Sequence, residues 1–203
     1  SKTARPVMEG CLRGRKHYVD ITGEVDVLEG MFARDGEFRS AGAMVLPGAG
    51  FDVVPTDCLA LHLKQKLPDA TKLVLAIRAP TRMSPGTAAT LLERMGQSGM
   101  VRRGGVLTPI ELGSLRRDRP FPAMAIPWGD LATAWRSTGI RDIEVYFAAG
   151  AGERFGLAVS RVRLLAPLVR AFVRATSTGP DEGLRRRGRA LVWGEVSSPD
   201  GRR

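Results

Sequence analysis

Apolar positions in the first seventy residues switch between helical spacing and short continuous runs. Apolar residues three and four apart indicate a helix with one buried face, and short apolar runs indicate strands. The predicted helices cover 3–15, 25–41 and 54–67, and the predicted strands cover 17–21 and 43–46. Helices that alternate with such strands are typical of βαβ units with a parallel sheet. Because two strands cannot form such a sheet alone, we expect here the C-terminal part of a doubly wound domain.

A new region begins at residue 72, where apolar and polar residues alternate up to 79. The predicted strands of this region cover 72–79, 106–112, 122–126, 142–148 and 190–196, and its predicted helices begin at 84, 128, 155 and 180. Glycines at 150 and 152 predict a hinge. The sequence Ser198-Pro199-Asp200-Gly201 predicts a turn between two hairpin strands, of which the second is missing. We therefore expect the chain to be cut at both ends.

Composition and charge narrow the function classes. The 203 residues are 43% hydrophobic and 26% charged, which is typical of a globular protein. No apolar run approaches the ~18–20 residues that span a membrane, and no secretory signal opens the chain. The net charge is +10 and lies mostly in the second half: residues 1–100 carry 13 basic and 11 acidic side chains, whereas 101–203 carry 18 and 10. Nucleic-acid binding would rest on this charge alone, without aromatic platforms, and is not expected.

The histidines and cysteines of the sequence argue against a metal site and against a serine hydrolase. His17 and His62 are the two histidines, and Cys11 and Cys58 are the two cysteines. Their spacing matches no zinc site, so we expect no metal. No Gly-x-Ser-x-Gly motif accompanies the histidines, which argues against a serine hydrolase. Two cysteines form no disulfide framework, which favours a cytoplasmic protein.

The segment from Gly48 to Asp52 follows one predicted strand and precedes a helix. Ligands of open parallel sheets bind beyond the carboxyl ends of the strands, where glycine lets the backbone approach a cofactor closely. Gly48 and Gly50 form only a Gly-x-Gly spacing, and the third glycine of the dinucleotide motif does not follow. The alternative is that these glycines serve a tight turn. Asp57, in the next helix, is more simply explained by a favourable interaction with the helix dipole.

The preceding predicted strand ends at the same edge of the sheet. Tyr18, Asp20, Thr22 and Glu24 lie along its end, so several carboxylates, including Asp52, are expected near one crevice. Carboxylates in such a place can hold a ribose hydroxyl or transfer a proton. The alternative for Asp20 is a structural role as the cap of a turn.

Two other segments allow a structural or a functional interpretation. Trp128 and Asp130 open a predicted helix, and could line a pocket, although a tryptophan at a helix start is more often an anchor in the core. Residues 155–175 form a basic amphipathic pattern that suits either a membrane surface or packing within the protein.

A family resemblance emerges from several segments taken together. Residues 17–24, HYVDITGE, and 46–57, LPGAGFDVVPTD, resemble the saccharopine dehydrogenase-like oxidoreductases, which include bacterial trans-acting enoyl reductases. Further matching segments are 84–88, 125–130, 137–140, 143–146 and 188–196. They span nearly the whole chain, and their joint order is specific although each segment alone is weak.

The resemblance implies a Rossmann domain followed by an α+β domain with a mixed sheet. Residues 1–70 would be the remnant of the Rossmann domain, and residues 71–203 the second domain, truncated at its C-terminus. The family's glycine-rich dinucleotide loop has no match in this chain, which puts cofactor binding by the 203 residues alone in doubt. The implied catalytic residues are Asp52, Glu24 and Asp20, and the implied cofactor-binding residues are Tyr18, Gly23, Gly50 and Phe51.

These expectations combine into one function and one alternative. The complete protein would be an NAD(P)-dependent oxidoreductase that uses NADP or NAD, transfers hydride to or from a small-molecule substrate, and forms homo-oligomers. The 203-residue piece alone would be inactive. The alternative is a non-catalytic module that keeps the fold and binds a membrane surface or a protein partner, with residues 155–175 as the contact.

Overall fold

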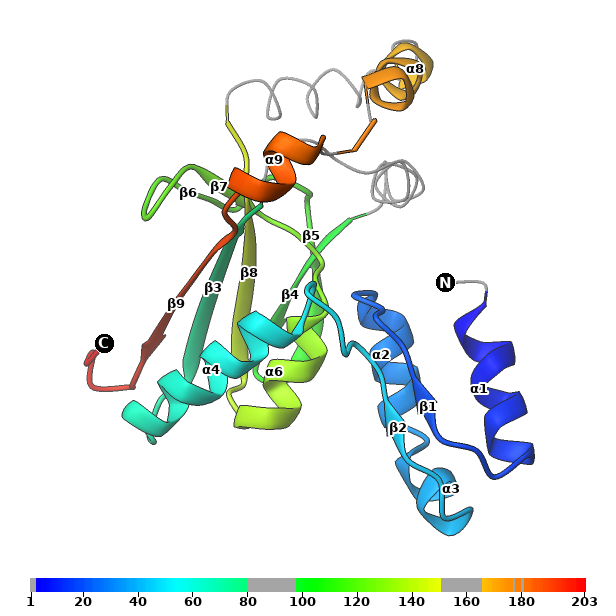
Figure 1. Ribbon diagram of the computed structural model, residues 1–203. Coiled ribbons are helices and arrows are strands. Elements are labelled where there is room, and N and C mark those ends of the chain that lie inside the picture. Colours follow the sequence, from blue (N-terminus) through cyan, green and yellow to red (C-terminus); the bar gives the residue numbers. More distant parts are fainter. Residues whose placement is uncertain (1–2, 80–97, 151–165, 177, 180) are drawn as a thin grey trace.

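The computed structural model describes residues 3–79, 98–150, 166–176, 178–179 and 181–203. The protein is mixed α/β (Figure 1): a small parallel sheet with three helices lies beside a larger, mostly antiparallel sheet. The predicted α/β class and the predicted mixed sheet are thereby confirmed. The expected helix from residue 84, most of the hinge at 150–152 and the first part of 155–175 lie outside the described residues.

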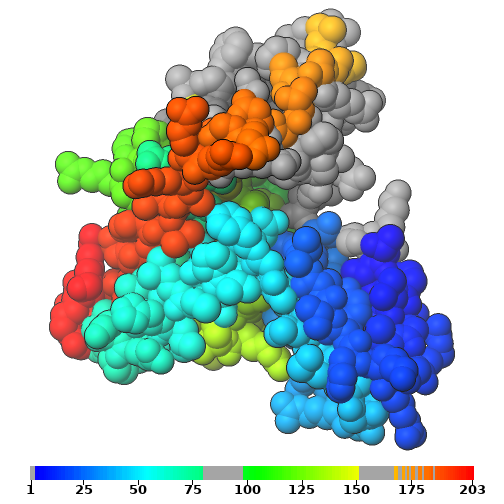
Figure 2. All heavy atoms as spheres, viewed as in Figure 1, coloured from blue at the N-terminus to red at the C-terminus, as the bar shows by residue number. Residues whose placement is uncertain are grey.

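The N-terminal lobe comprises residues 4–46 and is blue in Figure 2. Its elements are α1 (Ala4–Arg13), β1 (Tyr18–Val19), α2 (Val25–Phe32), α3 (Asp35–Ser40) and β2 (Val45–Leu46). The two strands pair in parallel, as predicted, with Tyr18 opposite Val45. The single helix predicted over 25–41 is instead two helices. The acidic residues Asp35 and Glu37 lie in the first turn of α3, where the helix dipole favours them, so a second helix start is favourable there.

Seven strands of the described residues form the large sheet. They are β3 (Lys72–Arg78), β4 (Gly99–Arg103), β5 (Val106–Ile110), β6 (Arg116–Arg117), β7 (Ala123–Ala125), β8 (Asp142–Ala148) and β9 (Leu191–Ser197). Their order is β5-β4-β8-β3-β9, while β7 pairs with β8 and β6 pairs with β7. The central pair β3 and β8 is parallel, and the other pairs are antiparallel. Strands β4 and β6 were not predicted, because arginines interrupt their apolar pattern.

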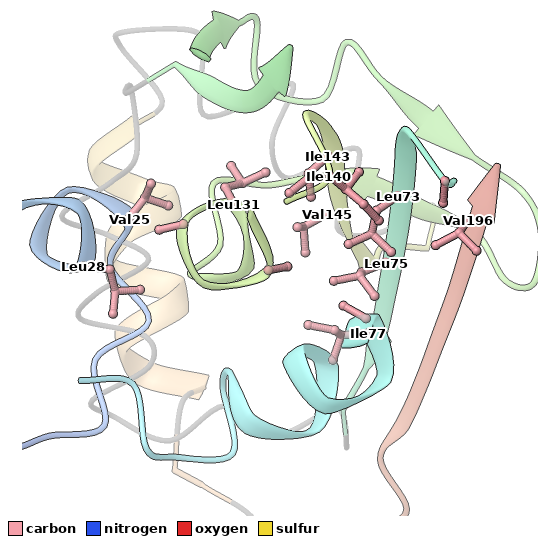
Figure 3. Packing of buried hydrophobic residues seen from close by; sticks show 14 residues of the cluster. Val25, Leu28, Leu73, Leu75, Ile77, Leu131, Ile140, Ile143, Val145 and Val196 are labelled. Atoms are coloured by element: carbon pink, nitrogen blue, oxygen red, sulfur yellow. The ribbon is translucent and has the colours of Figure 1, made fainter. Parts of the chain in front are cut away.

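Helices α4 (Val54–Lys66) and α6 (Asp130–Thr138) cover one face of the large sheet. Leucine and isoleucine side chains of β3 and β8 fill the space between sheet and helices (Figure 3), including Leu73, Leu75 and Ile143, all fully buried. Helix α4, which falls within the predicted N-terminal region 1–70, packs on β9 and α6 of the large sheet. A Cβ atom at Gly194 would lie 2.6 Å from Leu63 Cδ1, so glycine permits this close packing.

The opposite face of the large sheet is covered by its own long side chains. The Tyr146 hydroxyl donates a hydrogen bond of 2.6 Å to Glu144 Oε2. The Arg117 guanidinium lies over the rings of Trp193 and Tyr146, at 5.1 and 5.7 Å from their centroids. The hydrogen bond from Tyr146 gives the buried Glu144 carboxylate a polar partner.

The C-terminal part contains α8 (Ala166–Thr176), α9 (Glu182–Arg187) and the predicted turn after β9. Ser198 N–H donates to Arg202 O at 3.1 Å, and Gly201 N–H donates to Ser198 O at 3.0 Å. Gly201 has φ +88°, a left-handed conformation that glycine adopts without strain. The turn at 198–201 is therefore formed as predicted.

Candidate functional site

Three loop segments meet where β1 and β2 end and α6 begins. A Cβ atom at Gly129 would lie 2.9 Å from Val53 Cγ2, 3.0 Å from Leu28 Cδ1 and 3.4 Å from Gly23 Cα. The Trp128 indole N–H donates a hydrogen bond to the Asp52 carbonyl. We call this meeting point the joint, and define it as Gly23, Asp52, Val53, Trp128, Gly129 and Asp130. It attaches the N-terminal lobe to the large sheet.

Asp20 holds the two loops of the small sheet together. Its carboxylate accepts hydrogen bonds from the Tyr18 hydroxyl at 2.5 Å, from Thr22 N–H at 3.0 Å and from Gly48 N–H at 2.9 Å. Burial raises the pKa of Tyr18, and the hydrogen bond to Asp20 raises it further. Both side chains are therefore occupied with each other and with backbone, so the structure supports the turn-capping role for Asp20 that was one of its two interpretations.

Gly50 lies where the loop after β2 crosses the loop after β1. A Cβ atom at Gly50 would lie 2.8 Å from Ile21 Cβ, closer than real side chains approach. Gly48 has φ +70°, and a Cβ there would lie 3.3 Å from Thr22 O. Both glycines are thus needed for the crossing itself. The tight-turn interpretation accounts for them without a cofactor.

Exposed apolar side chains lie near Asp52: Phe51 and Val54 are close to it in the chain, and Ile21 lies against Gly50, two residues before it. Ile21 is 73% exposed, Phe51 is 58% exposed, and Val54 is also exposed. We call Ile21, Phe51 and Val54 the apolar platform. The Asp52 carboxyl lies beside Gly23, and partial desolvation raises its pKa. Asp52 is therefore the predicted site residue that presents a titratable group next to an open apolar surface.

Glu24 stands at the start of α2 and is half-buried. Its backbone N–H donates to Thr22 Oγ1 at 3.3 Å, and its carbonyl accepts from Leu28 N–H at 3.0 Å. Tyr18 thus lies on β1, and Asp20, Gly23 and Glu24 lie in the segment that joins β1 to α2.

Asp130 is a further candidate. The sequence left open whether the helix start at Trp128 and Asp130 lines a pocket or anchors the core. Asp130 is the first residue of α6 and is fully buried. Within the described residues, neither of its carboxyl oxygens has a hydrogen-bond partner. Burial raises its pKa to about 8, and the negative charges of Asp57 and Asp52 act in the same direction. A polar residue directly after Trp-Gly at a helix start was the only signal for it.

Arg102 on β4 is a second buried charge that the sequence did not reveal. Its Nε donates to Leu131 O and its Nη1 to Gly105 O, each at 2.6 Å, and its Nη2 is hydrogen-bonded to Glu29. The guanidinium also stacks on the Trp135 ring, 4.1 Å from its centroid. A depression of about 340 Å³ lies beside it, lined by Glu29, Phe32, Trp135, Arg136 and Gly139.

Two further features do not occur in the part of the chain that the structure describes. No group of three or more histidine, cysteine, aspartate or glutamate residues is placed to hold a metal ion. Among the helices described, none has the length and apolar character required to cross a bilayer.

Comparison with known proteins adds no further assignment. No protein-family model matches the chain, and a search of curated proteins found no significant relative. The resemblance to saccharopine dehydrogenase-like oxidoreductases therefore stays a prediction, and what it implies for the function is a proposal.

Proposed function

We propose that this chain carries the nicotinamide end of an NAD(P)-dependent oxidoreductase active site. The observation that carries the proposal is the apolar platform beside Asp52, at the carboxyl ends of two parallel strands. This edge of a parallel sheet is where cofactors and substrates of α/β enzymes bind. A flat nicotinamide ring suits exposed Phe51 and Ile21, so these residues fit that part of the cofactor. The pyrophosphate would need residues outside this set.

The proposed roles of the predicted residues follow from their surroundings. When bound, the cofactor supplies or accepts the hydride. Phe51 would contact the ring, and Gly23 and Gly50 would keep the surrounding backbone close. Asp52 would deliver a proton to a reduced substrate, or take one up in the reverse direction, because partial desolvation raises its pKa.

The remaining predicted residues have less direct roles in this proposal. Glu24 would provide a second carboxylate near the substrate. Asp20 and Tyr18 would position the loops, since their side chains are already engaged with each other. We further propose a small-molecule substrate, a cytoplasmic location and self-association, with residues 1–70 as the cofactor domain and residues 71–203 as the substrate domain.

The proposal is tested by binding of reduced nicotinamide mononucleotide, which contains the ring end without the adenosine half. We expect saturation-transfer NMR to show contact between the protein and the ring protons. The contact should be lost in Phe51→Ala, because that variant removes the aromatic part of the apolar platform.

Val106→Ala is a matched control, because Val106 is exposed on β5, 67% by area, and lies outside the apolar platform. This variant should bind like the unmodified protein. Absence of transfer to the ring at millimolar ligand, or equal loss in both variants, would contradict the proposal. A parallel titration with NADPH and NADH would then measure what the rest of the dinucleotide contributes.

The alternative function is contact with an anionic membrane through the region 155–175. Helix α8 covers its second half, and Leu168 on this helix is 66% exposed. An exposed leucine on an amphipathic helix can insert into the interfacial region of a bilayer. Flotation with vesicles of phosphatidylserine and phosphatidylcholine, at low and high salt, tests this function. Salt-sensitive binding that Leu168→Asn abolishes would support it, and absence of binding would exclude it.

A further inference from the structure

Asp130 lies inside the joint, and within the described residues its carboxyl oxygens accept no hydrogen bond. It has no exposed surface, and both carboxyl oxygens lack a hydrogen bond. The Thr133 hydroxyl, one turn later in α6, is equally buried and unpaired. Burying an ionised carboxylate without a partner is strongly unfavourable, whereas a neutral carboxylic acid can be buried at far lower cost.

The charged groups around Asp130 do not compensate a negative charge. From α4 and the loop before it, Asp57 and Asp52 both face it with charges of the same sign. From α2, the carboxylate of Glu29 is engaged by Arg102 of β4, whose guanidinium is also hydrogen-bonded to the carbonyl of Leu131. The guanidinium of Arg102 is therefore already committed to other acceptors.

Two neighbouring groups favour the charged form, but only weakly. The Thr56 hydroxyl is close enough to lower the pKa of Asp130, yet its own proton is donated to Val53 O at 2.9 Å. The position at the N-terminus of α6 also favours a negative charge. Burial outweighs both, so the pKa is raised to about 8.

We propose that Asp130 is a buried proton-binding site that couples pH to the closure of the joint. The closed joint holds Asp130 as a neutral acid, and loss of the proton to solvent opens it. Gly129 and Trp128 directly precede Asp130 and contact Gly23 and Asp52. Movement of the start of α6 therefore loosens the attachment of the N-terminal lobe. This inference does not depend on the proposed oxidoreductase function.

The direction of the pH effect follows from proton linkage. The ordinary pKa of an aspartate is 3.8, and that of Asp130 in the closed joint is about 8. Between these values the closed state binds a proton that the open state lacks. Closure is therefore most favourable at low pH, weakens as pH rises, and reaches its weakest level above pH 8.

The indole N–H of Trp128 provides a direct readout, because its hydrogen bond to Asp52 exists only when the joint is closed. Its NMR signal is identified by its loss in Trp128→Phe. We expect this signal to shift between pH 6 and 9.5, with a midpoint near 8. Amide protection factors in α2 and α6 should fall over the same range.

Asp130→Asn and Asp57→Asn form a matched pair of variants. Asp130→Asn cannot ionise, so its Trp128 signal and protection factors should not change between pH 6 and 9.5. Asp57→Asn leaves Asp130 intact, so the transition should persist, with its midpoint moved to lower pH. A transition of unchanged midpoint and size in Asp130→Asn would overturn the proposal.

If Asp130→Asn fails to fold, a measurement on the unmodified protein tests whether Asp130 binds the proton that controls closure of the joint. The 13C signal of the Asp130 carboxyl reports its protonation directly. A titration midpoint near 8 that coincides with the Trp128 transition supports the proposal. A midpoint near 4, or a Trp128 signal that is constant over the range, refutes it.

Discussion

The guanidinium of Arg102 on β4 is hydrogen-bonded to the carboxylate of Glu29 on α2, 73 residues earlier in the chain. Arg102 is buried, and burial lowers its pKa while Glu29 acts in the opposite direction. The pair lies beside the depression described above and near the joint, because Arg102 also donates a hydrogen bond to the carbonyl of Leu131, the residue after Asp130. It forms a second attachment between the N-terminal lobe and the large sheet.

Loss of this attachment should destabilise the protein. Arg102→Met removes three hydrogen bonds and leaves Glu29 without its cation, so we expect a decrease of about 3 kcal/mol in the free energy of unfolding. Urea denaturation measures it. Arg39→Met is the control: Arg39 is exposed and pairs at 3.0 Å with Asp35 of its own helix, so its loss should cost less than about 1 kcal/mol. An equal loss of unfolding free energy in both variants would mean that Arg102 contributes no more to stability than an exposed arginine.

The hydrogen bonds of Asp20 predict a role in stability. Asp20→Ala leaves the Tyr18 hydroxyl and two backbone N–H groups without their acceptor, so we expect a loss of about 2–3 kcal/mol. Tyr18→Phe removes only one of these bonds and should cost about 1 kcal/mol. Thermal unfolding of both variants provides the comparison. Unchanged stability of Asp20→Ala would show that these hydrogen bonds do not contribute to the stability of the fold.

Replacing glycine by alanine is expected to have opposite effects on stability at Gly50 and Gly36. Gly50→Ala places a methyl group 2.8 Å from Ile21 Cβ, so the loops must separate, at a cost of about 1–3 kcal/mol. Gly36, inside α3, has no atom within 4 Å of its would-be Cβ, and Gly36→Ala should stabilise the helix by about 0.5–1 kcal/mol. Denaturation midpoints distinguish the two. A stabilised Gly50→Ala would disprove the close crossing of the loops.

Glu144 makes stability sensitive to acid. Burial alone would raise its pKa, but hydrogen bonds from Tyr146 and Arg103 and the charge of Lys72 outweigh burial and lower it. Stability from this group is present above its ordinary value of 4.5 and is lost as pH falls below that value. Glu144→Gln should flatten this decline in an unfolding series from pH 6 to 3. An identical decline in the variant would assign the acid sensitivity to other carboxylates.

The sequence alone determined the local elements whose residues alternate or recur with a clear period. Strands β3 and β8 were predicted almost to the residue, because each places Leu, Ile or Val on the face that α4 and α6 cover. A helix start was predicted at residue 128, and α6 begins two residues later at Asp130. These features depend on nearby residues and on the burial of one face. The order of apolar and polar residues along the chain shows both.

The tertiary structure decided which elements meet and which polar groups are buried. Strand β4 escaped prediction because Arg102 is polar in sequence, and only Glu29 and backbone carbonyls from distant segments make its burial favourable. Helix α4 follows the small sheet in sequence but packs on the large one. In the sequence, Asp130 is an ordinary residue at a helix start. The packing around it buries its carboxyl group without a hydrogen-bond partner among the described residues. Periodicity indicates that a side chain is buried, but the partner that buries it comes from far along the chain, and that partner sets the chemistry of the site.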